Sequence, residues 1–278
     1  MDTDQVWAIA MVKDEADIIL ETLTHVASEG VDGIAVIDNG SSDGTLELLH
    51  EARNSLLCPI WIYEDPEVGY FQSVRMTWLS KVVAKEGADW VIPFDADELW
   101  YCNDMQVAPY LRSLPKKTAS VGARLWNHYG TDLDAPGKPF TSIVYKNPEA
   151  GTLPKMAFRP KGNFTVTAGN HGVLRKKRGE EENILFQSDA SEDLMINIRH
   201  FPYRSFEQFL RKVINGGRAF EATDFPEDMG AHWRQYYTFW KNGGDEAIFE
   251  IYKQWFYFAD PVGSGMVEDP APFCRWAD

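Results

Sequence analysis

The sequence predicts an α/β fold in which a mostly parallel sheet is flanked by helices and followed by a helical C-terminal extension. Short apolar runs alternate with segments of helical length through the first hundred residues, which is the pattern of βαβ units. After residue 115 the alternation weakens, and short strand-like runs are separated by Gly, Pro and Asn. From residue 205 the apolar residues recur at helical spacing.

The N-terminal half is expected to contain four buried strands, because four short runs are almost continuously apolar. They span residues 6–11, 33–37, 60–63 and 90–94. Helices are expected over residues 14–28 and 70–85, and a third after Ser42 or Asp43, either of which can cap it. Ligands of open parallel sheets bind at the carboxyl ends of the strands. Acidic residues follow three of the four predicted strands, which indicates a site at that edge.

The C-terminal half is expected to add further strands and then helices. The strands are predicted at residues 121–126, 155–159, 164–167 and 194–198, and the helices from residue 205, over 231–240 and over 245–258. The aromatic stripes of these helices are interpreted as packing surfaces. We therefore expect an α/β domain over residues 1–204 and a helical extension packed on it over residues 205–278.

Composition excludes several classes of protein. The 278 residues include 42 acidic and 27 basic side chains, a net charge of −15, which argues against nucleic acid as a partner. No run of 18 apolar residues exists, so no transmembrane segment is predicted. Three scattered cysteines are too few for a disulfide framework or a zinc site. These features predict a cytoplasmic protein.

The acids at the strand ends are candidate ligand-binding residues, each with a plainer alternative. Asp95 and Asp97 follow a hydrophobic strand directly and can both face a divalent cation such as Mg²⁺ or Mn²⁺, or belong to a surface turn. Asp38 can accept hydrogen bonds from a nucleobase or ribose, or from amides of its own loop. Glu15 can bind a ligand or simply favour the start of a helix. Arg75 can reach a phosphate or remain solvated.

Taken in order and at these spacings, the residues resemble the family 2 glycosyltransferases, and in particular a family 2-like subgroup. The resemblance is carried by residues 11–15, 37–45, Gly69 with Arg75, 94–98, 169–171 and 199–205. It covers most of residues 6–220 and implies the GT-A fold over residues 1–204 and a nucleoside-diphosphate sugar as donor. The usual Asn after the arginine is Met76 in this chain.

The resemblance also implies roles for individual residues. The donor nucleotide is expected to lie among Lys13, Glu15, Asp38, Arg75 and Asp95. A Mn²⁺ or Mg²⁺ ion is expected on Asp95 and Asp97. His200 is the candidate third ligand, because a late histidine completes the metal shell in several transferases of this fold; the alternative is a buried histidine packed by its aromatic neighbours.

Two residues are candidates for the catalytic base that removes the acceptor proton. Asp193 follows Glu192 in a pair similar to the family's Glu-Asp motif, although the pair precedes a predicted strand and does not open a helix. His171 is chemically competent because an unperturbed histidine titrates near ~6.5. The alternatives are a loop acid for Asp193 and a strand-end histidine bonded to the backbone for His171.

The predicted function is a hexosyltransferase-type glycosyltransferase that moves a sugar from a nucleoside diphosphate, UDP above all, to a hydroxyl of a glycan or lipid-linked acceptor. The reaction is expected to be metal-dependent and inverting. The alternatives are a non-catalytic nucleotide-sugar-binding module, a nucleotidyltransferase and a phosphatase with an Asp nucleophile. A nucleotidyltransferase would need a Gly-rich loop after the first strand, and this chain has none there. A phosphatase places its Asp pair after the first strand, whereas this pair follows the fourth.

Overall fold

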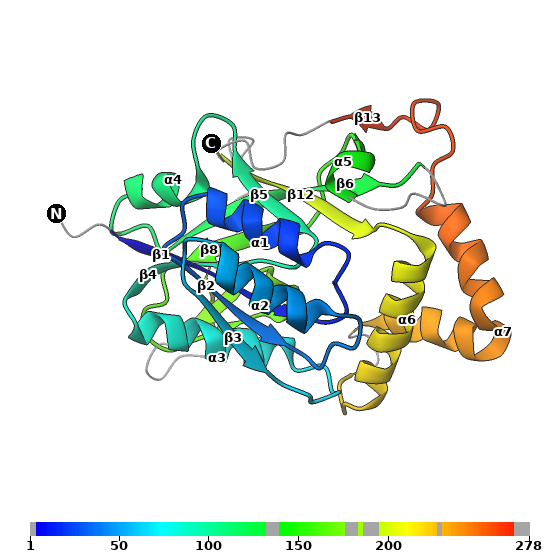
Figure 1. Ribbon diagram of the computed structural model, residues 1–278, viewed down its shortest axis with the longest axis horizontal. Helices are drawn as coiled ribbons and strands as arrows, with labels where there is room; N and C mark the ends of the chain where they lie inside the picture. Colours follow the sequence, from blue (N-terminus) through cyan, green and yellow to red (C-terminus); the bar gives the residue numbers. More distant parts are fainter. Residues whose placement is uncertain (1–3, 132–138, 176–182, 186–194, 227–229, 270–278) are drawn as a thin grey trace.

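The computed structural model describes residues 4–131, 139–175, 183–185, 195–226 and 230–269. Its N-terminal half is a parallel sheet with strand order β3-β2-β1-β4 (Figure 1). The strands are β1 (Gln5–Val12), β2 (Gly33–Asp38), β3 (Ile60–Glu64) and β4 (Ala88–Pro93). All four predicted strands, and the α/β fold class, are therefore confirmed.

Helices cover both faces of this sheet. They are α1 (Ile19–Ser28), α2 (Thr45–Ser55) and α3 (Gln72–Lys85). Side chains of β1 point alternately to the two faces: Ala8 packs in the cluster that contains residues of α1 and α2, and Ile9 packs with α3. Each face of the sheet thus buries its own apolar cluster. Because β1 is buried on both faces, its sequence is apolar at nearly every position.

Two predicted helix starts differ from those observed. Helix α1 begins at Ile19 and not near residue 14, because Asp14 has a positive φ of 52° and the chain forms a loop there. Helix α2 has Gly44 as its N-cap, with a φ of 99°, in place of Ser42 or Asp43. Asp43 still contributes at this end, since its Oδ1 accepts a hydrogen bond from the Thr45 amide at 3.1 Å.

The second half of the chain extends the sheet mainly through antiparallel pairs. Its strands are β5 (Glu98–Cys102), β6 (Ser120–Tyr129), β7 (Tyr145–Lys146), β8 (Lys155–Phe158), β12 (Ile196–Tyr203) and β13 (Val267–Glu268). A separate small sheet contains β9 (Phe164–Val166), β10 (Val173–Arg175) and β11 (Asn183–Leu185). Short helices α4 (Val107–Ser113), α5 (Pro139–Ser142) and η1 (Ala168–Asn170) complete this part. Strand β5 and helix α4 were not predicted.

Two long helices stand beyond the carboxyl ends of β1 and β4 (Figure 1). They are α6 (Phe206–Glu221), capped by the Ser205 hydroxyl, and α7 (Ala231–Trp255). Helix α7 corresponds to the two predicted C-terminal helices and is broken at Gly244, whose φ is 65°. Phe209 and Val213 of α6 pack with Ile248 and Tyr252 of α7 in a cluster of their own.

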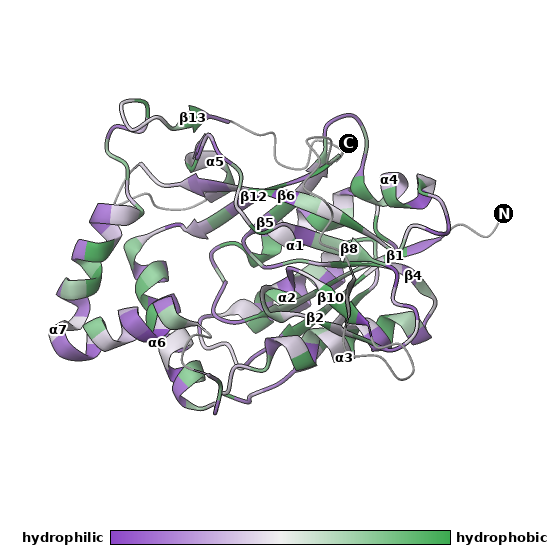
Figure 2. Cartoon of the chain, turned by 180° about the vertical axis from the view of Figure 1, so that it is seen from behind, coloured by the Kyte–Doolittle hydropathy of each residue, from purple (hydrophilic) through white to green (hydrophobic). Residues whose placement is uncertain are grey.

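Apolar residues are concentrated on the central strands, whereas α6 and α7 alternate between apolar and polar residues (Figure 2). This pattern is expected of two helices that bury one face against each other and expose the other. In the described residues, no helix combines the length and the apolar character that crossing a membrane requires.

Candidate functional site

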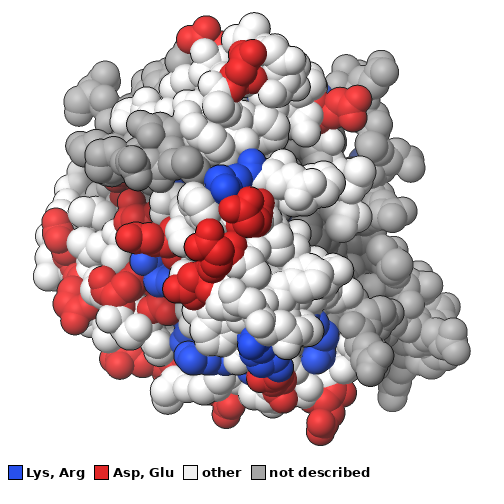
Figure 3. All heavy atoms as spheres, turned by 90° about the vertical axis from the view of Figure 1, so that its right-hand side faces the viewer, with Lys and Arg blue, Asp and Glu red and all other residues white. Residues whose placement is uncertain are grey.

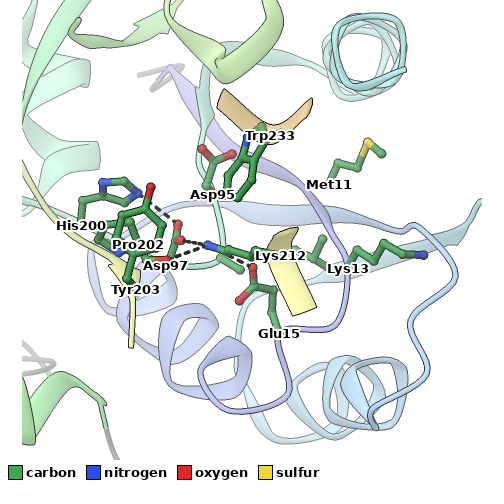
Figure 4. Close-up of a pocket in the computed structure, with 12 residues that line it drawn as sticks. Met11, Lys13, Glu15, Asp95, Asp97, His200, Pro202, Tyr203, Lys212 and Trp233 are labelled. Atoms are coloured by element: carbon green, nitrogen blue, oxygen red, sulfur yellow. Dashed lines mark hydrogen bonds and ion pairs between the residues drawn. The ribbon is translucent and has the colours of Figure 1, made fainter. Parts of the chain in front are cut away.

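The ends of β1 and β4 deliver two acidic segments to one edge of the sheet. The strands are parallel neighbours, so Glu15, after β1, and Asp97, after β4, lie close together. They line a cavity of about 250 Å³ whose walls also come from β12, α6 and α7. Figure 4 shows the main lining residues, which include Met11, Lys13, Glu15, Asp95, Asp97, His200, Tyr203, Lys212 and Trp233.

The backbone of the turn between the two aspartates is held on both sides. The Thr22 hydroxyl of α1 donates to the carbonyl of Ala96 at 2.5 Å, and the amide of Phe201 donates to the carbonyl of Asp97 at 2.9 Å. Because helix α1 and strand β12 both contact this turn, the backbone that carries the two carboxylates is held in place at the cavity.

Asp97 is buried and surrounded by positive charge. Lys212 Nζ lies 2.5 Å from its Oδ2, and Arg204 Nη1 lies 3.7 Å from the same oxygen. Burial alone would raise the pKa of the Asp97 carboxyl, but the positive charges of Lys212 and Arg204 hold it well below its usual range. Asp97 is therefore a carboxylate at neutral pH.

Glu15 shares these cationic partners. Its carboxylate is ion-paired with Arg204, and Lys212 Nζ lies 3.7 Å from its Oε1. Burial raises the pKa of Glu15, and the positive charges of Lys212 and Arg204 only partly offset this effect. Arg204 is 3% exposed and also binds Asp17. This guanidinium therefore joins the residues before α6 to the loop between β1 and α1.

Asp95 has protein donors on both of its oxygens. Lys155 Nζ lies 2.5 Å from Oδ2, and the side-chain amide of Asn170 donates to Oδ1 at 3.0 Å. Lys155 is itself buried and lies 2.9 Å from Oε1 of Glu98. Burial raises the pKa of Glu98 to about 7, against the opposing effect of Lys155. Lys155 and Glu98 are thus buried partners of Asp95, which itself lines the cavity.

His200 faces Asp97 without forming a hydrogen bond to it. Its Nδ1 lies 2.7 Å from Asn127 Oδ1, so this nitrogen carries the proton, and its Nε2 lies 3.6 Å from Asp97 Oδ1. Burial lowers the pKa of His200 to about 4, although the charge of Asp97 acts in the other direction. Neutral His200 therefore directs a lone pair at a carboxylate oxygen.

The three predicted metal ligands are not assembled as a ligand set. Both oxygens of Asp95 and one oxygen of Asp97 contact protein donors, which leaves the facing pair of Asp97 Oδ1 and His200 Nε2. Mg²⁺ and Mn²⁺ take about six hard ligands and favour oxygen. No group of three or more His, Cys, Asp or Glu side chains among the described residues could hold a metal ion. The arrangement therefore does not fit the expected metal, and metal binding by these residues stays a prediction.

A second cavity of about 290 Å³ adjoins the first. Lys13, Glu15, Lys212 and Trp233 line both, and the second cavity extends along α6 and past Tyr70. Its further lining residues include Asp14, Asn39, Gln72, Gln208, Arg211 and Asn215. Lys13 Nζ donates to the carbonyls of Asn39 and Gly40 at 2.7 and 3.1 Å, which holds its ammonium group against the loop that follows β2.

Two predicted nucleotide contacts, Asp38 and Arg75, are not among the lining residues of either cavity. The buried Asp38 accepts a hydrogen bond from the Ser41 amide at 3.0 Å, and among the described residues its other oxygen has no hydrogen-bond partner. Arg75, on α3, forms an ion pair with Asp65 at the end of β3. Asp38 thus also stabilises its own loop, and the guanidinium of Arg75 is already ion-paired with Asp65.

The two candidate bases are Asp193 and His171. Asp193 lies outside the described residues. His171 Nδ1 lies 3.1 Å from the carbonyl oxygen of Pro154, which can only accept, so Nδ1 carries the proton and Nε2 holds a lone pair. Burial, aided by Lys155, lowers the pKa of His171. His171 is therefore neutral at neutral pH. It follows Asn170, the residue that donates to Asp95, and so lies next to this contact in the chain.

The sequence analysis missed three side chains at the site: Lys155, Lys212 and Trp233. Lys212 had a detectable signal in its position on α6. It lies outside the apolar stripe that contains Phe209 and Val213, on the same side as Gln208 one turn earlier, and both Gln208 and Lys212 line the second cavity. Lys155 had none, since it opens an ordinary strand-like run.

Comparison with known proteins gives one family. The sequence model of "Glycosyl transferase family 2" matches residues 8–178. No curated protein matches the chain. Among solved structures, TarS from S. aureus is 15% identical, with 84% of this chain and 42% of that chain covered and a TM-score of 0.38. This chain thus spans less than half of that protein.

Two further solved structures give similar values. A TarS fragment, residues 1–349, is 14% identical over 86% of this chain and 74% of that chain, with a TM-score of 0.37. HddC from Yersinia pseudotuberculosis is 15% identical over 55% of this chain and 76% of that chain, with a TM-score of 0.34.

Proposed function

The chain belongs to glycosyl transferase family 2 and has the GT-A fold, and on this premise we propose that it transfers a sugar from a nucleoside diphosphate to a hydroxyl acceptor. The observation that supports this function best is the convergence of Glu15, Asp97 and Lys212 on one cavity at the carboxyl ends of β1 and β4. UDP-sugars are the proposed donors, and a glycan or lipid-linked hydroxyl is the proposed acceptor.

In this proposal the two adjoining cavities hold the donor. The second cavity, with Tyr70 and Asn39 among its lining residues, offers apolar and amide contacts to a nucleoside. The first cavity, with Asp97 and Lys212, receives the diphosphate and the sugar. The lysine charges compensate the negative charge that grows on the diphosphate as it leaves.

The proposed chemical step is a single displacement with inversion. The acceptor oxygen forms a bond to the anomeric carbon while the bond between that carbon and the diphosphate oxygen breaks. The bonding electrons leave with the nucleoside diphosphate, and the hydroxyl proton passes to a base. His171 is the base that we propose from the described residues, because its Nε2 holds a lone pair and its pKa is lowered. Asp193 remains the candidate of the family resemblance.

The proposed step uses no metal ion, because the oxygens predicted to bind it already contact Lys155, Asn170 and Lys212. Dependence on Mn²⁺ or Mg²⁺ stays a prediction of the family resemblance. It is tested by nucleotide binding with and without Mn²⁺.

The first experiment is a thermal-shift panel of nucleoside diphosphates, followed by release of nucleoside diphosphate from a panel of nucleotide sugars. We expect UDP or GDP to raise the melting temperature, since a ligand that binds only the folded state stabilises it. Asp97→Asn should abolish release of the diphosphate, whereas Asp224→Asn, an exposed acid after α6, should leave it unchanged. A protein that no nucleoside diphosphate stabilises and that consumes no nucleotide sugar would contradict the proposal.

A further inference from the structure

We propose that the ammonium group of Lys212 is the built-in cation of this site and contacts the donor's diphosphate where the family resemblance expects a divalent metal ion. The inference rests on the proposed function and adds to it the residue that binds the diphosphate. It starts from the position of Lys212 Nζ, which lies 2.5 Å from Asp97 Oδ2 and 3.7 Å from Glu15 Oε1.

The location of this ammonium matches the role. Figure 4 shows Lys212 Nζ between the carboxylates of Asp97 and Glu15, inside the cavity. Its side chain is 25% exposed, so the group reaches the cavity while remaining largely shielded from solvent. Lys212 also lines the second cavity, and a diphosphate that spans the two cavities would pass it.

Lys212 has a donor left for a phosphate. An ammonium group carries three N–H donors. Asp97 Oδ2 accepts at 2.5 Å and the carbonyl of Pro202 at 3.2 Å, whereas Glu15, at 3.7 Å, is beyond hydrogen-bond distance. Lys212 can therefore keep its contact with Asp97 and donate to a phosphate oxygen at the same time.

A divalent ion at the same position would meet positive charge. Such an ion on Asp97 Oδ2 would compete with Lys212 at 2.5 Å and approach Arg204, whose Nη1 lies 3.7 Å from that oxygen. Lys155 holds Asp95 in the same way. Repulsion between buried like charges is strong, so the lysines and a divalent ion are alternatives for these oxygens.

The outer surface offers little competition for an anionic ligand. On the face that carries α6 and α7, Asp and Glu side chains are spread widely, and the visible Lys and Arg side chains lie in smaller groups among and below them (Figure 3). In contrast, Lys13 and Lys212 line both cavities, and Arg211 lines the second. The charge that would hold a diphosphate is therefore placed inside the site.

The test is calorimetric titration of UDP and UMP, with GDP and GMP in parallel, first in EDTA and then with Mn²⁺. In EDTA, the wild type should bind the diphosphate about tenfold more tightly than the monophosphate, because one charge-assisted contact is added. Lys212→Met should remove this preference, and Lys212→Arg, which keeps the charge, should retain part of it. Lys241→Met, which breaks an exposed ion pair with Glu221, is the matched control and should bind like the wild type.

Several outcomes would overturn the inference. One is that Lys212→Met binds UDP in EDTA as tightly as the wild type does, and another is that the wild type binds UDP only with Mn²⁺. Should Lys212→Met fail to fold, the wild type still decides, because equal affinity for UDP and UMP in EDTA refutes the contact. Binding of the monophosphate distinguishes failure of this inference from failure of the proposed function. If the proposed function is wrong, no nucleotide binds in any condition.

Discussion

Arg204 donates from Nε and Nη2 to the two carboxylate oxygens of Asp17, at 2.7 and 2.8 Å, across 187 positions of sequence. This two-point contact fixes the orientation of the guanidinium as well as its position. The same group is ion-paired with Glu15 and lies near Asp97. The segment that starts α6 is thereby anchored to the loop that starts α1, and both line the site.

The first prediction concerns this anchor. Arg204→Met should lower the free energy of unfolding by about 3 kcal/mol, because it leaves the buried Glu15 carboxylate without its nearest cationic partner. Arg204→Lys should recover only part of the loss, since an ammonium cannot make the two-point contact. Urea denaturation measures both. Arg218→Met, at an exposed position of the same helix, is the control, and an equal effect of the two Met variants would disprove the anchoring role.

The second prediction compares two adjacent glycines of α6. A Cβ atom at Gly217 would overlap the ring of Tyr237, whereas one at Gly216 would lie 3.4 Å from the Trp233 ring. Gly217→Ala should therefore cost about 2 kcal/mol of stability through overpacking between α6 and α7. Gly216→Ala should be neutral or stabilising by up to about 1 kcal/mol, because alanine favours the helix.

Denaturation curves of the two alanine variants decide the question. If both variants unfold at the same urea concentration, the close contact between Gly217 and Tyr237 does not determine how the helices pack.

The third prediction concerns the base. His171→Ala should lower turnover by about 10²–10⁴-fold while the affinity for UDP is kept, because a general base acts on the acceptor proton and not on the donor. Burial and Lys155 lower the pKa of His171 from its ordinary value of 6.5. A base must be deprotonated, so the acid limb of the wild-type rate profile should lie below pH 6.5 and should disappear in His171→Ala.

Asp193→Asn and His50→Gln are the comparison variants for this measurement. Loss of turnover in Asp193→Asn alone, with the acid limb unchanged in His171→Ala, would assign the base to Asp193. His50, on α2, should tolerate its substitution without a change in rate.

The fourth prediction is a pH dependence of stability. Asp269 accepts from His128 at 3.2 Å and lies near Arg199 and Lys146. The His128 hydrogen bond, with the two cations, holds the pKa of Asp269 well below its ordinary value of 3.8. A carboxyl group with a lowered pKa stabilises the folded state above its unfolded pKa, and this contribution is lost as pH falls through the folded pKa.

Asp269→Asn should therefore cost about 2 kcal/mol at pH 7, and the difference from the wild type should shrink below about pH 4. Denaturation curves at pH 7, 5 and 3 measure this. A difference that stays constant over this range would show that the charge of Asp269 contributes nothing to stability.

Much of the N-terminal half could be predicted because its signals are local. The strands β1 to β4 are short apolar runs, and helix α1 between the first two has one clear apolar face. Strand β5 was missed because it starts at Glu98, directly after the acidic turn, and is defined by pairing with β12 nearly a hundred positions later. Antiparallel pairing of this kind leaves little trace in local sequence.

The site was predictable in position but not in detail. A motif places Asp38 at a strand end, but the Ser41 amide of its own loop then binds one carboxylate oxygen. The partners of the aspartate pair come from far along the chain, with Lys155 60 positions after Asp95 and Lys212 115 positions after Asp97. Such contacts depend on how separate elements pack, so spacing alone does not reveal them.

The cavity walls come from two parts of the chain that can change separately. Glu15, Asp95 and Asp97 lie within the matched residues 8–178, whereas Lys212 and Trp233 lie on α6 and α7 beyond them. Substitutions in the two helices can therefore alter which molecule is accommodated while the sheet edge stays the same. Selectivity in this protein can diversify on its helical side without rebuilding the scaffold that supports it.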